Sequence, residues 1–413
     1  MLKLFIQLNY RYLYTLSTTP TTNTTIIIIN YFIKKATRRL STLKIICNQK
    51  LLANKIGIVQ KAINSKTTLD LLKGVLLVTK QDVIVFKGYD LEIGIETHVS
   101  AEVIEEGSIV INSKLFGDII RKLPDSFVEI ETDEDNNVYI NCLNSKFKIK
   151  GDSAKEYPQI PDVNEDKLYS IPQDVLKSMI KQTVFATSQD QTKPILMGEL
   201  LEIENGNINL VAIDGYRFAV RSCQVDNLSH EDIKAKIIIP GKTLIDVNSL
   251  LSSEEDVKVG FNEKNAIFIL DETKIVTRLL DGEFIDYNKL CPREYNSKIK
   301  LKTRDLLNSI ERASLLSQSE LNNLIKLSIR DSVMAITSNN EKGNVYEEVA
   351  LSLEGDYLDI AFNSRYLLEG LKNIDCEEIF IEFTTNVNPC IIKPADGTKY
   401  TYLLLPVRIS SNN

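Results

Sequence analysis

The side chains best suited to acid–base and metal chemistry are scarce in this sequence. His98 and His230 are the only two histidines among 413 residues. Two histidines offer very few candidates for a Ser-His-Asp triad, a multi-histidine zinc site or a histidine proton shuttle, so the sequence does not favour these kinds of site. The six cysteines include no C-x-x-C pair and no tight cluster, so we expect reduced core residues. They are Cys47, Cys142, Cys223, Cys291, Cys376 and Cys390.

Three short motifs resemble parts of catalytic or metal sites but lack their companions. Gly241-Lys242-Thr243 matches the end of a P-loop, yet Lys236 stands where that motif requires glycine. Asp133 begins a pattern like a calcium loop, but Val138 occupies the glycine position, so we expect a hairpin turn there. Ser178-Met179-Ile180-Lys181 fits S-x-x-K without its partner motifs. The sequence predicts no catalytic residue, no metal and no cofactor.

The many carboxylates leave one enzymatic alternative open. A metal-dependent nuclease or phosphoryl-transfer enzyme needs several Asp and Glu side chains that converge on one pocket. No spacing among the 56 acidic residues indicates such convergence. Magnesium-dependent cleavage that a single carboxylate substitution abolishes would favour this alternative.

The composition is that of a soluble globular protein, with 43% hydrophobic and 25% charged residues. No uncharged apolar run approaches the roughly 18 residues of a membrane span, so an integral membrane protein is excluded. The net charge of −7 is uneven, because residues 1–42 hold six basic residues and no acid. Subtracting that +6 from −7 leaves −13 on the rest of the chain.

Residues 1–42 differ in character from the rest of the chain. They are rich in threonine and basic, with neither clean amphipathic periodicity nor a small-residue cleavage site. We expect a disordered or spurious leader, with a strand beginning at Leu43, which an alternative start codon could encode. The other hypothesis is a genuine leader of an organellar or exported variant.

Two landmarks recur along the rest of the chain at the period of a whole domain. Segments with helical periodicity begin 124 and 131 residues apart, at 48–63, 172–187 and 303–316. A second, shorter helix recurs at offsets of 128 and 123 residues, beginning at Ser113, Gly241 and Ser364. Short β-branched runs separated by turn residues lie between the helices.

The repeat predicts an α+β protein of three similar domains, each with two helices packed on β-sheets. Segments rich in turn residues separate them near Tyr157–Tyr169 and Cys291–Lys300. The predicted boundaries are 43–168, 169–294 and 295–413.

The six predicted helices collect positive charge. Together they sum to +7 within a body of −13, a segregation that favours contact with a polyanion. If two chains close head to tail, twelve helices spaced roughly 10 Å apart line a ring about 38 Å across their axes. Subtracting helix bodies of roughly 10 Å leaves a bore of about 28 Å, wide enough for duplex DNA.

Several short motifs in this order resemble the bacterial DNA polymerase III beta subunit, the replication sliding clamp. They are Thr68-Leu69-Asp70-Leu71-Leu72-Lys73-Gly74, Thr192-Lys193-Pro194-Ile195-Leu196-Met197-Gly198, Asp214-Gly215-Tyr216-Arg217-Phe218-Ala219, Leu280-Asp281-Gly282-Glu283-Phe284 and Tyr402-Leu403-Leu404-Leu405-Pro406-Val407-Arg408-Ile409. The resemblance runs from residue 43 to residue 409.

The resemblance implies a non-enzymatic, cytoplasmic processivity factor. Its partners would be duplex DNA bound without sequence specificity, a second copy of the chain, the replicative polymerase subunit, a clamp-loader ATPase and other proteins that carry the clamp-binding motif, but no membrane. The implied fold is a head-to-tail ring of clamp domains with helices lining the bore.

The resemblance also implies a partner-peptide groove between the second and third domains. Its residues would be Leu196, Gly215, Tyr216, Arg217, Phe218, Ile285, Lys289, Leu290, Pro389, Leu403, Leu405, Pro406, Val407 and Arg408. Such an apolar slot suits a short peptide, and Arg217 and Arg408 could orient its polar groups. Tyr216 and Ile285 depart from the family, which commonly has His and Pro there.

DNA contacts are expected at two kinds of position. Lys66 and Lys193 resemble bore-facing loop lysines of the family, and a flexible single charge suits contact with phosphate. The charge of the predicted helices adds Lys50, Lys55, Arg121 and Lys122.

Overall fold

The computed structural model describes residues 41–165, 168–225, 234–252, 255–292, 294–317 and 323–408. Almost all of the expected leader therefore lies outside the described residues, as does His230. Strand β1 (Ser41–Asn48) begins two residues before the predicted Leu43, because Ser41 already pairs with Asp133 of β7. The chain divides into two compact units, residues 41–87 with 98–157, and residues 88–97 with 158–408.

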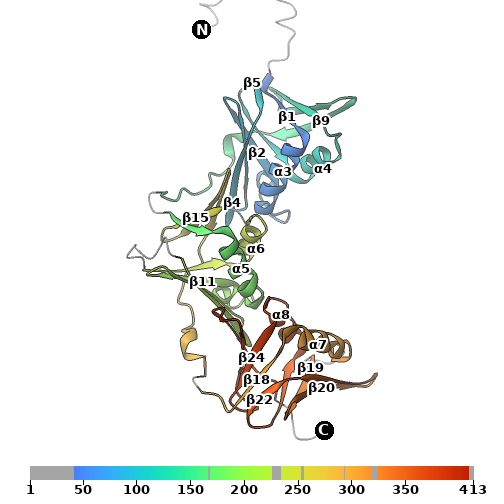
Figure 1. The fold of residues 1–413 in the computed structure, drawn as a ribbon. Helices are drawn as coiled ribbons and strands as arrows, with labels where there is room; N and C mark the ends of the chain where they lie inside the picture. The colour runs from blue at the N-terminus through green and yellow to red at the C-terminus, as the bar shows by residue number, and fades with distance from the viewer. Residues whose placement is uncertain are drawn as a thin grey trace, which may run out of the picture. The chain divides into compact units, whose positions relative to one another are not determined.

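The first unit packs two α-helices on one face of an antiparallel sheet (Figure 1). Asn48 caps α3 by accepting hydrogen bonds from the backbone N–H groups of Lys50 and Leu51, and Asn112 caps α4 in the same way. The helices are α3 (Gln49–Val59) and α4 (Ser113–Lys122), with short 3₁₀ turns η1 (Gln60–Ala62), η2 (Asp70–Lys73) and η3 (Ala154–Glu156).

The strands of this unit pair in the order β3-β2-β6-β9-β8-β7-β1-β5. They are β2 (Gly74–Lys80), β3 (Val83–Tyr89), β5 (Glu102–Glu105), β6 (Ser108–Asn112), β7 (Phe127–Asp133), β8 (Asn137–Cys142) and β9 (Ser145–Asp152). Asp133 ends β7 in the predicted hairpin turn, where its carboxylate accepts hydrogen bonds from the backbone of Asp135 and Asn137. The calcium-like pattern is therefore a turn in which the Asp133 carboxylate binds backbone N–H groups of the turn itself.

The second unit contains the second and third repeats. Its helices are α5 (Gln173–Thr183), α6 (Gly241–Asn248), α7 (Thr303–Ser317) and α8 (Ser364–Leu371), with 3₁₀ turns η4 (Val184–Ala186), η5 (Pro194–Met197) and η7 (Tyr287–Lys289). Ser178 lies within α5, where its hydroxyl donates to the Val175 carbonyl, and Gly241 begins α6 directly after a strand. Neither motif forms the site that its sequence resembles.

A nine-stranded sheet crosses from the second repeat into the third. Its order is β14-β11-β12-β13-β26-β25-β24-β18-β22. The strands are β11 (Gly198–Glu204), β12 (Asn207–Ile213), β13 (Arg217–Gln224), β14 (Lys234–Pro240), β18 (Ser297–Lys302), β22 (Ser352–Gly355), β24 (Glu378–Phe383), β25 (Cys390–Pro394) and β26 (Tyr400–Leu404). The crossing point is the antiparallel pair β13–β26, where Phe218 lies opposite Leu403.

Two smaller arrays complete the second unit. One pairs β10 (Tyr169–Pro172), β15 (Asp256–Phe261), β16 (Asn265–Leu270), β17 (Thr273–Arg278) and residues 93–97 of β4 (Ile93–Ser100). The other runs β21 (Gly343–Ala350), β20 (Val333–Asn340), β19 (Leu324–Arg330) and β23 (Leu358–Asn363). The second and third repeats thus share the nine-stranded sheet.

The predicted helical segments are confirmed. α3, α5 and α7 bury the apolar side of their sequence, for example Leu176 and Ile180 in α5, because residues three and four apart lie on one helix face. The α+β fold of three clamp-like repeats is confirmed, with six α-helices in the described residues. In the same residues, no helix is long and apolar enough to cross a membrane, and no three His, Cys, Asp or Glu side chains cluster as metal ligands.

Candidate functional site

Exposed apolar side chains surround the β13–β26 junction. Tyr216 is 62% exposed, Leu405 38%, Ile285 44% and Leu290 41%. Beneath them lies a buried apolar cluster that contains three more predicted groove residues, Leu196, Phe218 and Leu403. The structure therefore packs Leu196, Phe218 and Leu403, which come from three separate elements, into one buried cluster.

The turn before β13 explains the D-G-Y-R motif. One carboxylate oxygen of Asp214 accepts hydrogen bonds from the backbone N–H groups of Tyr216, at 2.8 Å, and Arg217, at 3.0 Å. Gly215 has φ +97°, a backbone conformation that residues other than glycine rarely adopt. The turn projects Tyr216 outward, where its ring stacks on Tyr366 of α8 with centroids 6.0 Å apart.

Arg217 is buried and fully engaged inside the molecule. Its guanidinium lies 2.9 Å from the Asp214 carboxylate and 2.6 Å from the Glu369 carboxylate, and it donates to the Phe185 carbonyl at 2.7 Å. The rings of Phe185 and Tyr366 lie against it, 5.4 and 4.5 Å from the guanidinium carbon. Arg217 thus joins the second repeat to α8 of the third, and its predicted contact with a peptide stays a prediction.

The charges around Arg217 keep it protonated. Burial alone would lower the pKa of the guanidinium, but the surrounding Tyr402, Asp214 and Glu369 together raise it above its ordinary value. The group is therefore a permanent cation at this junction.

The C-terminal groove residues follow β26. The backbone N–H of Leu405 donates to the Tyr216 carbonyl at 2.9 Å, and that of Val407 donates to the Ala361 carbonyl at 2.8 Å. Pro406 and Val407 are half-buried, and Arg408 is exposed. On the neighbouring strand, Pro389 is half-buried directly before β25. Backbone bonds to two other elements thus fix this end of the groove.

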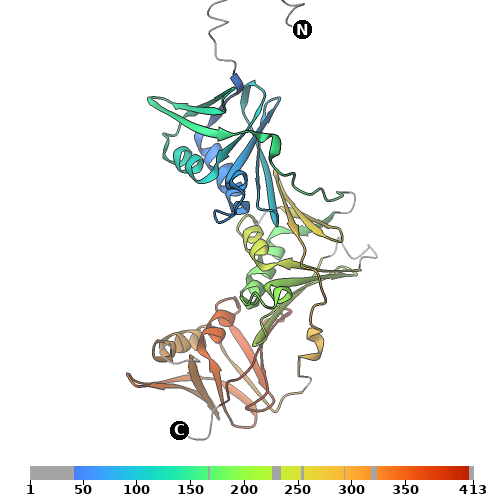
Figure 2. The same cartoon turned by 180° about the vertical axis from the view of Figure 1, so that it is seen from behind.

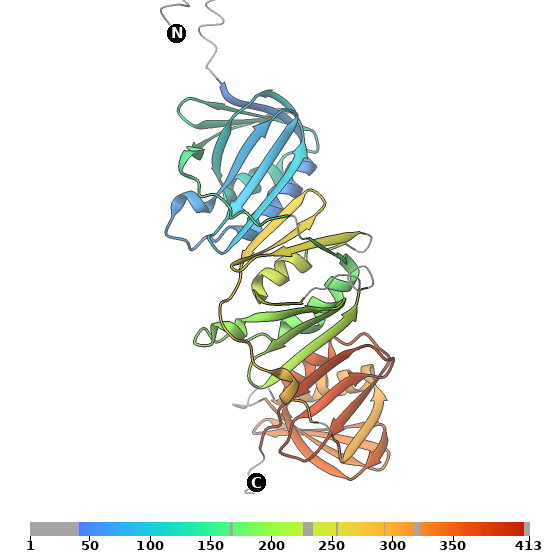
Figure 3. The same cartoon turned by 90° about the vertical axis from the view of Figure 1, so that its left-hand side faces the viewer.

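A segment between β17 and η7 supplies the remaining groove residues. We call residues 279–290 the strap. It lies on the face of the β11–β14 sheet opposite α5 and α6 (Figures 1 and 2). Figure 3 shows it in yellow and orange along the outside of the green strands. The strap carries Ile285, Lys289 and Leu290, and Lys289 pairs with Asp286 at 3.0 Å.

The predicted DNA-contacting residues lie on exposed helix and loop surfaces. In the first unit, Lys50 pairs with Asp125 at 2.6 Å and Arg121 with Asp118 at 2.7 Å, whereas Lys66 lies in the exposed loop after η1. Lys122 is exposed and Lys55 half-buried in the same two helices. In the second unit, Lys193 is exposed directly before η5.

Three family models of the DNA polymerase III beta subunit match this chain in succession. The N-terminal domain model matches residues 43–161, the central domain model residues 170–286 and the C-terminal domain model residues 288–408. The chain belongs to the DNA polymerase III beta subunit family. It is therefore a sliding clamp, a non-catalytic processivity factor of DNA polymerase, and the nuclease alternative is set aside.

Individual relatives agree over nearly their whole length. The beta sliding clamp of Staphylococcus epidermidis is 36% identical over 366 residues, 86% of this chain and 96% of the relative. The solved sliding clamp of Bacillus subtilis is 33% identical with a TM-score of 0.86, covering 90% of this chain and 100% of that one. The Pseudomonas aeruginosa DnaN sliding clamp, solved bound to griselimycin, is 25% identical with a TM-score of 0.84 over 89% and 100%.

Sequence reasoning missed the aromatic side chains that lie around the predicted groove residues of this beta-subunit family member. Phe185 and Tyr366 enclose Arg217, and Tyr287 packs beneath the strap against Phe218. Each lies outside the motifs that carry the family resemblance, at a position where the sequence indicates only a hydrophobic core residue. The one available signal in the sequence was Arg217 itself. If this arginine is buried, other side chains must enclose its guanidinium, as Phe185 and Tyr366 do.

Proposed function

We propose that two copies of this chain close head to tail into a ring around duplex DNA. The observation that carries this proposal is the complementarity of two open sheet edges, β9 in the first unit and β21 in the second. An exposed strand edge offers unpaired backbone groups to another chain. Proteins therefore either protect such an edge or pair it with a strand of a second subunit.

The β9 edge is basic. β9 pairs with β8 along Ser145–Lys150 but with β6 only at Gly151 and Asp152. Its segment 145–152 nets +2, with Lys146, Lys148 and Lys150 exposed on one face. Phe147, 39% exposed, points to the opposite face, since it lies across from buried Ile140 of β8.

The β21 edge is acidic. β21 is the outermost strand of its sheet and pairs with β20. Residues 341–350 net −2, and Glu348 and Tyr346 are exposed on its outer face. On the helix side, Leu315 of α7 is 72% exposed. Pairing of β9 with β21 of a second copy would place lysines beside acids and Phe147 beside Leu315, which supports a closed dimer.

The helices and loops supply the proposed DNA contacts. Lys66 and Lys193, with Lys50, Lys55, Arg121 and Lys122 of the first unit, would contact phosphates without reading bases. The proposal places the ring in the cytoplasm with its DNA, and assigns the three domains to residues 43–168, 169–294 and 295–413, preceded by the leader.

The groove would hold partners in turn. We propose that its apolar floor of Leu196, Phe218 and Leu403 takes a short apolar peptide of the replicative polymerase subunit, the clamp-loader ATPase or other proteins with the same motif. We propose the same groove for griselimycin, the compound bound in the P. aeruginosa structure.

Charge reversal at the two edges tests ring closure. Lys146→Glu with Lys148→Glu should weaken dimerisation about 100-fold, since like charges then meet at both joints. Glu341→Lys with Glu348→Lys should do the same. An equimolar mixture of the two variants should dimerise again, because each joint then pairs opposite charges. Sedimentation measures the mass against the monomer's 46.7 kDa.

The control reverses two exposed lysines elsewhere, Lys258→Glu with Lys264→Glu, and should remain dimeric. A wild-type monomer, or variants whose mixture stays monomeric, would overturn the proposed joint.

A further inference from the structure

The strap is fixed at its start by backbone hydrogen bonds to neighbouring segments, whereas the backbone hydrogen bond near its end lies within the strap itself. Near its start, the N–H groups of Leu279 and Leu280 donate to the carbonyls of Lys264 and Ile238, at 2.8 and 2.9 Å. Near its end, the η7 turn closes as the N–H of Leu290 donates to the Tyr287 carbonyl at 3.0 Å. Between these points, the strap carries the groove residue Ile285.

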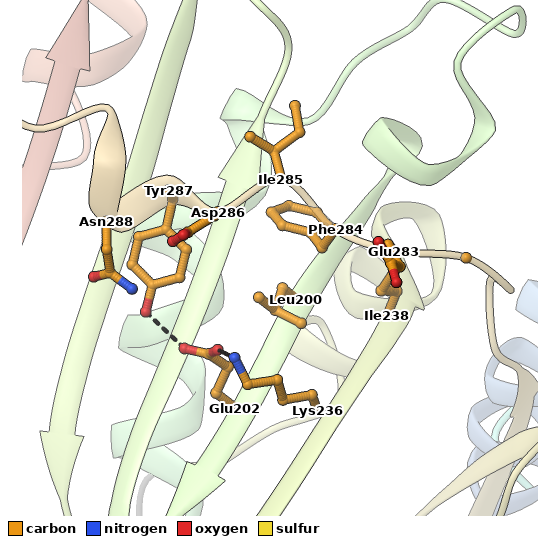
Figure 4. A pocket seen from close by; sticks show the side chains of 11 residues that line it. Leu200, Glu202, Lys236, Ile238, Glu283, Phe284, Ile285, Asp286, Tyr287 and Asn288 are labelled. Carbon is orange, nitrogen blue, oxygen red and sulfur yellow. Dashed lines mark hydrogen bonds and ion pairs between the residues drawn. The ribbon is translucent and has the colours of Figure 1, made fainter.

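Tyr287 connects the strap to the sheet by its hydroxyl. The side chain is 8% exposed, and its hydroxyl donates to Oε2 of Glu202 at 2.6 Å (Figure 4). Its ring packs against Phe218, with centroids 6.5 Å apart. The same buried cluster contains Leu196 and Leu403, so Tyr287 is part of the apolar floor that these residues form.

Glu202 is itself fixed by the sheet. It lies on β11 opposite Lys236 of β14, whose Nζ is 2.6 Å from Oε1. Asn209 of β12 reaches Oε2 at 3.4 Å. Burial is the largest influence on the pKa of Glu202 and raises it, but the hydrogen bonds from Lys236 and Tyr287 lower the pKa overall. Glu202 is therefore an ionised acceptor, and hydrogen bonds to an ionised group are strong.

A pocket interrupts the packing between the strap and the sheet. The pocket has a volume of about 330 Å³ and is lined by Leu200 and Ile238 of the sheet and by Phe284 and Ile285 of the strap. Figure 4 shows these side chains around the space, with the Tyr287–Glu202 hydrogen bond at one side. Because this pocket opens to solvent, the strap packs on the sheet only in part here, and the Tyr287–Glu202 hydrogen bond adds a fixed point of contact.

We infer that Tyr287 and Glu202 are positioning residues of the peptide groove, since their hydrogen bond holds the strap where Ile285, Lys289 and Leu290 can contact a bound peptide. This inference rests on the groove of the proposed function. Neither residue needs to touch the peptide, because the side chains of Tyr287 and Glu202 are both buried.

The test is the affinity of the dimeric protein for griselimycin. Tyr287→Phe removes one hydroxyl and should weaken binding about tenfold, because the strap then samples positions that cannot bind. Glu202→Leu should weaken it similarly, and the double variant should add little to either single change. Glu202→Gln keeps an acceptor oxygen for Tyr287 and should restore most of the affinity.

Two controls separate the inference from its premise. Tyr357→Phe removes the hydroxyl that bonds to Asp331 on a distant surface and should bind as wild type. Leu405→Asp alters the groove itself and should abolish binding. If the wild-type protein does not bind griselimycin, or if Leu405→Asp still binds it, the proposed groove is wrong. If both meet them but Tyr287→Phe binds as wild type, or Glu202→Gln is as weak as Glu202→Leu, the positioning role is overturned.

Amide hydrogen exchange gives a second readout that is independent of binding. In Tyr287→Phe without ligand, the amides of Lys289 and Leu290 should exchange about tenfold faster, while those of β26 stay unchanged. Uniform acceleration across the second unit would indicate general destabilisation and would count against a local positioning role.

Discussion

Arg217→Met should lower the free energy of unfolding of the second unit by about 3–5 kcal/mol, because it leaves the largely buried Asp214 carboxylate without its cation and removes one of the two cations that pair with Glu369. The side chain of Asp214 is 11% exposed and that of Glu369 is 29% exposed, and both face the guanidinium. The Phe185 carbonyl would also lose its donor. Scanning calorimetry, which separates the transitions of a multi-domain chain, measures the loss.

Arg365 provides a matched control. It pairs with the same Glu369 at 2.7 Å, but its side chain is 69% exposed. Arg365→Met should therefore cost less than about 1 kcal/mol, as exposed ion pairs usually do. Equal losses from the two substitutions would contradict the conclusion that Arg217 is the buried joint between the second repeat and α8.

Glu199→Gln should stabilise the protein above neutral pH and remove part of its pH dependence. Glu199 lies on β11 with no exposed surface, and its Oε2 is 2.6 Å from the Thr183 hydroxyl. That hydroxyl is also 2.8 Å from the Met179 carbonyl. A hydroxyl has one proton, so both contacts are satisfied when Thr183 donates to Met179 and a protonated Glu199 donates to Thr183.

The pKa of Glu199 sets the pH window. Burial raises it from 4.5 to about 8, against a smaller opposing effect of the Thr183 hydrogen bond. Between these values the unfolded chain releases a proton that the folded protein keeps, so stability falls as pH rises, by about 1.4 kcal/mol per pH unit. The loss ends near pH 8, where the folded state also ionises.

Denaturant unfolding at a series of pH values measures this effect. The difference in stability between Glu199→Gln and wild type should grow in favour of the variant from about pH 4.5 to pH 8 and then level off. Glu204→Gln, at the exposed end of the same strand, is the matched control. Parallel curves for wild type and Glu199→Gln would show that the buried carboxyl is not protonated.

The sequence was most informative where a physical rule is local. Helical periodicity placed α3, α5 and α7 to within a few residues, because apolar residues every three to four positions form a continuous face only in a helix. The D-G-Y-R segment contributed to the family resemblance, and the structure shows a turn there in which Gly215 has a positive φ. Repetition of these local signals at the period of a domain then predicted the fold.

The sequence was least informative about pairs of residues far apart in the chain. Tyr287 and Glu202 are separated by 85 positions, and no local pattern shows that a linker tyrosine bonds a strand glutamate. Arg217 looked like a surface cation for a peptide, whereas tertiary packing encloses it between two rings. Such contacts depend on how sheets and linkers meet, which periodicity does not encode.

Retention on DNA of different topology tests the central claim most directly. The protein is loaded onto nicked circular DNA by the proposed clamp-loader ATPase with ATP and washed at high salt. It is then compared with an identical sample linearised after loading. A closed ring should stay on the circle and leave the linear DNA through its ends, because salt weakens phosphate contacts but does not open the ring. Equal loss from circle and line would show that the protein holds DNA by charge alone and would contradict encirclement.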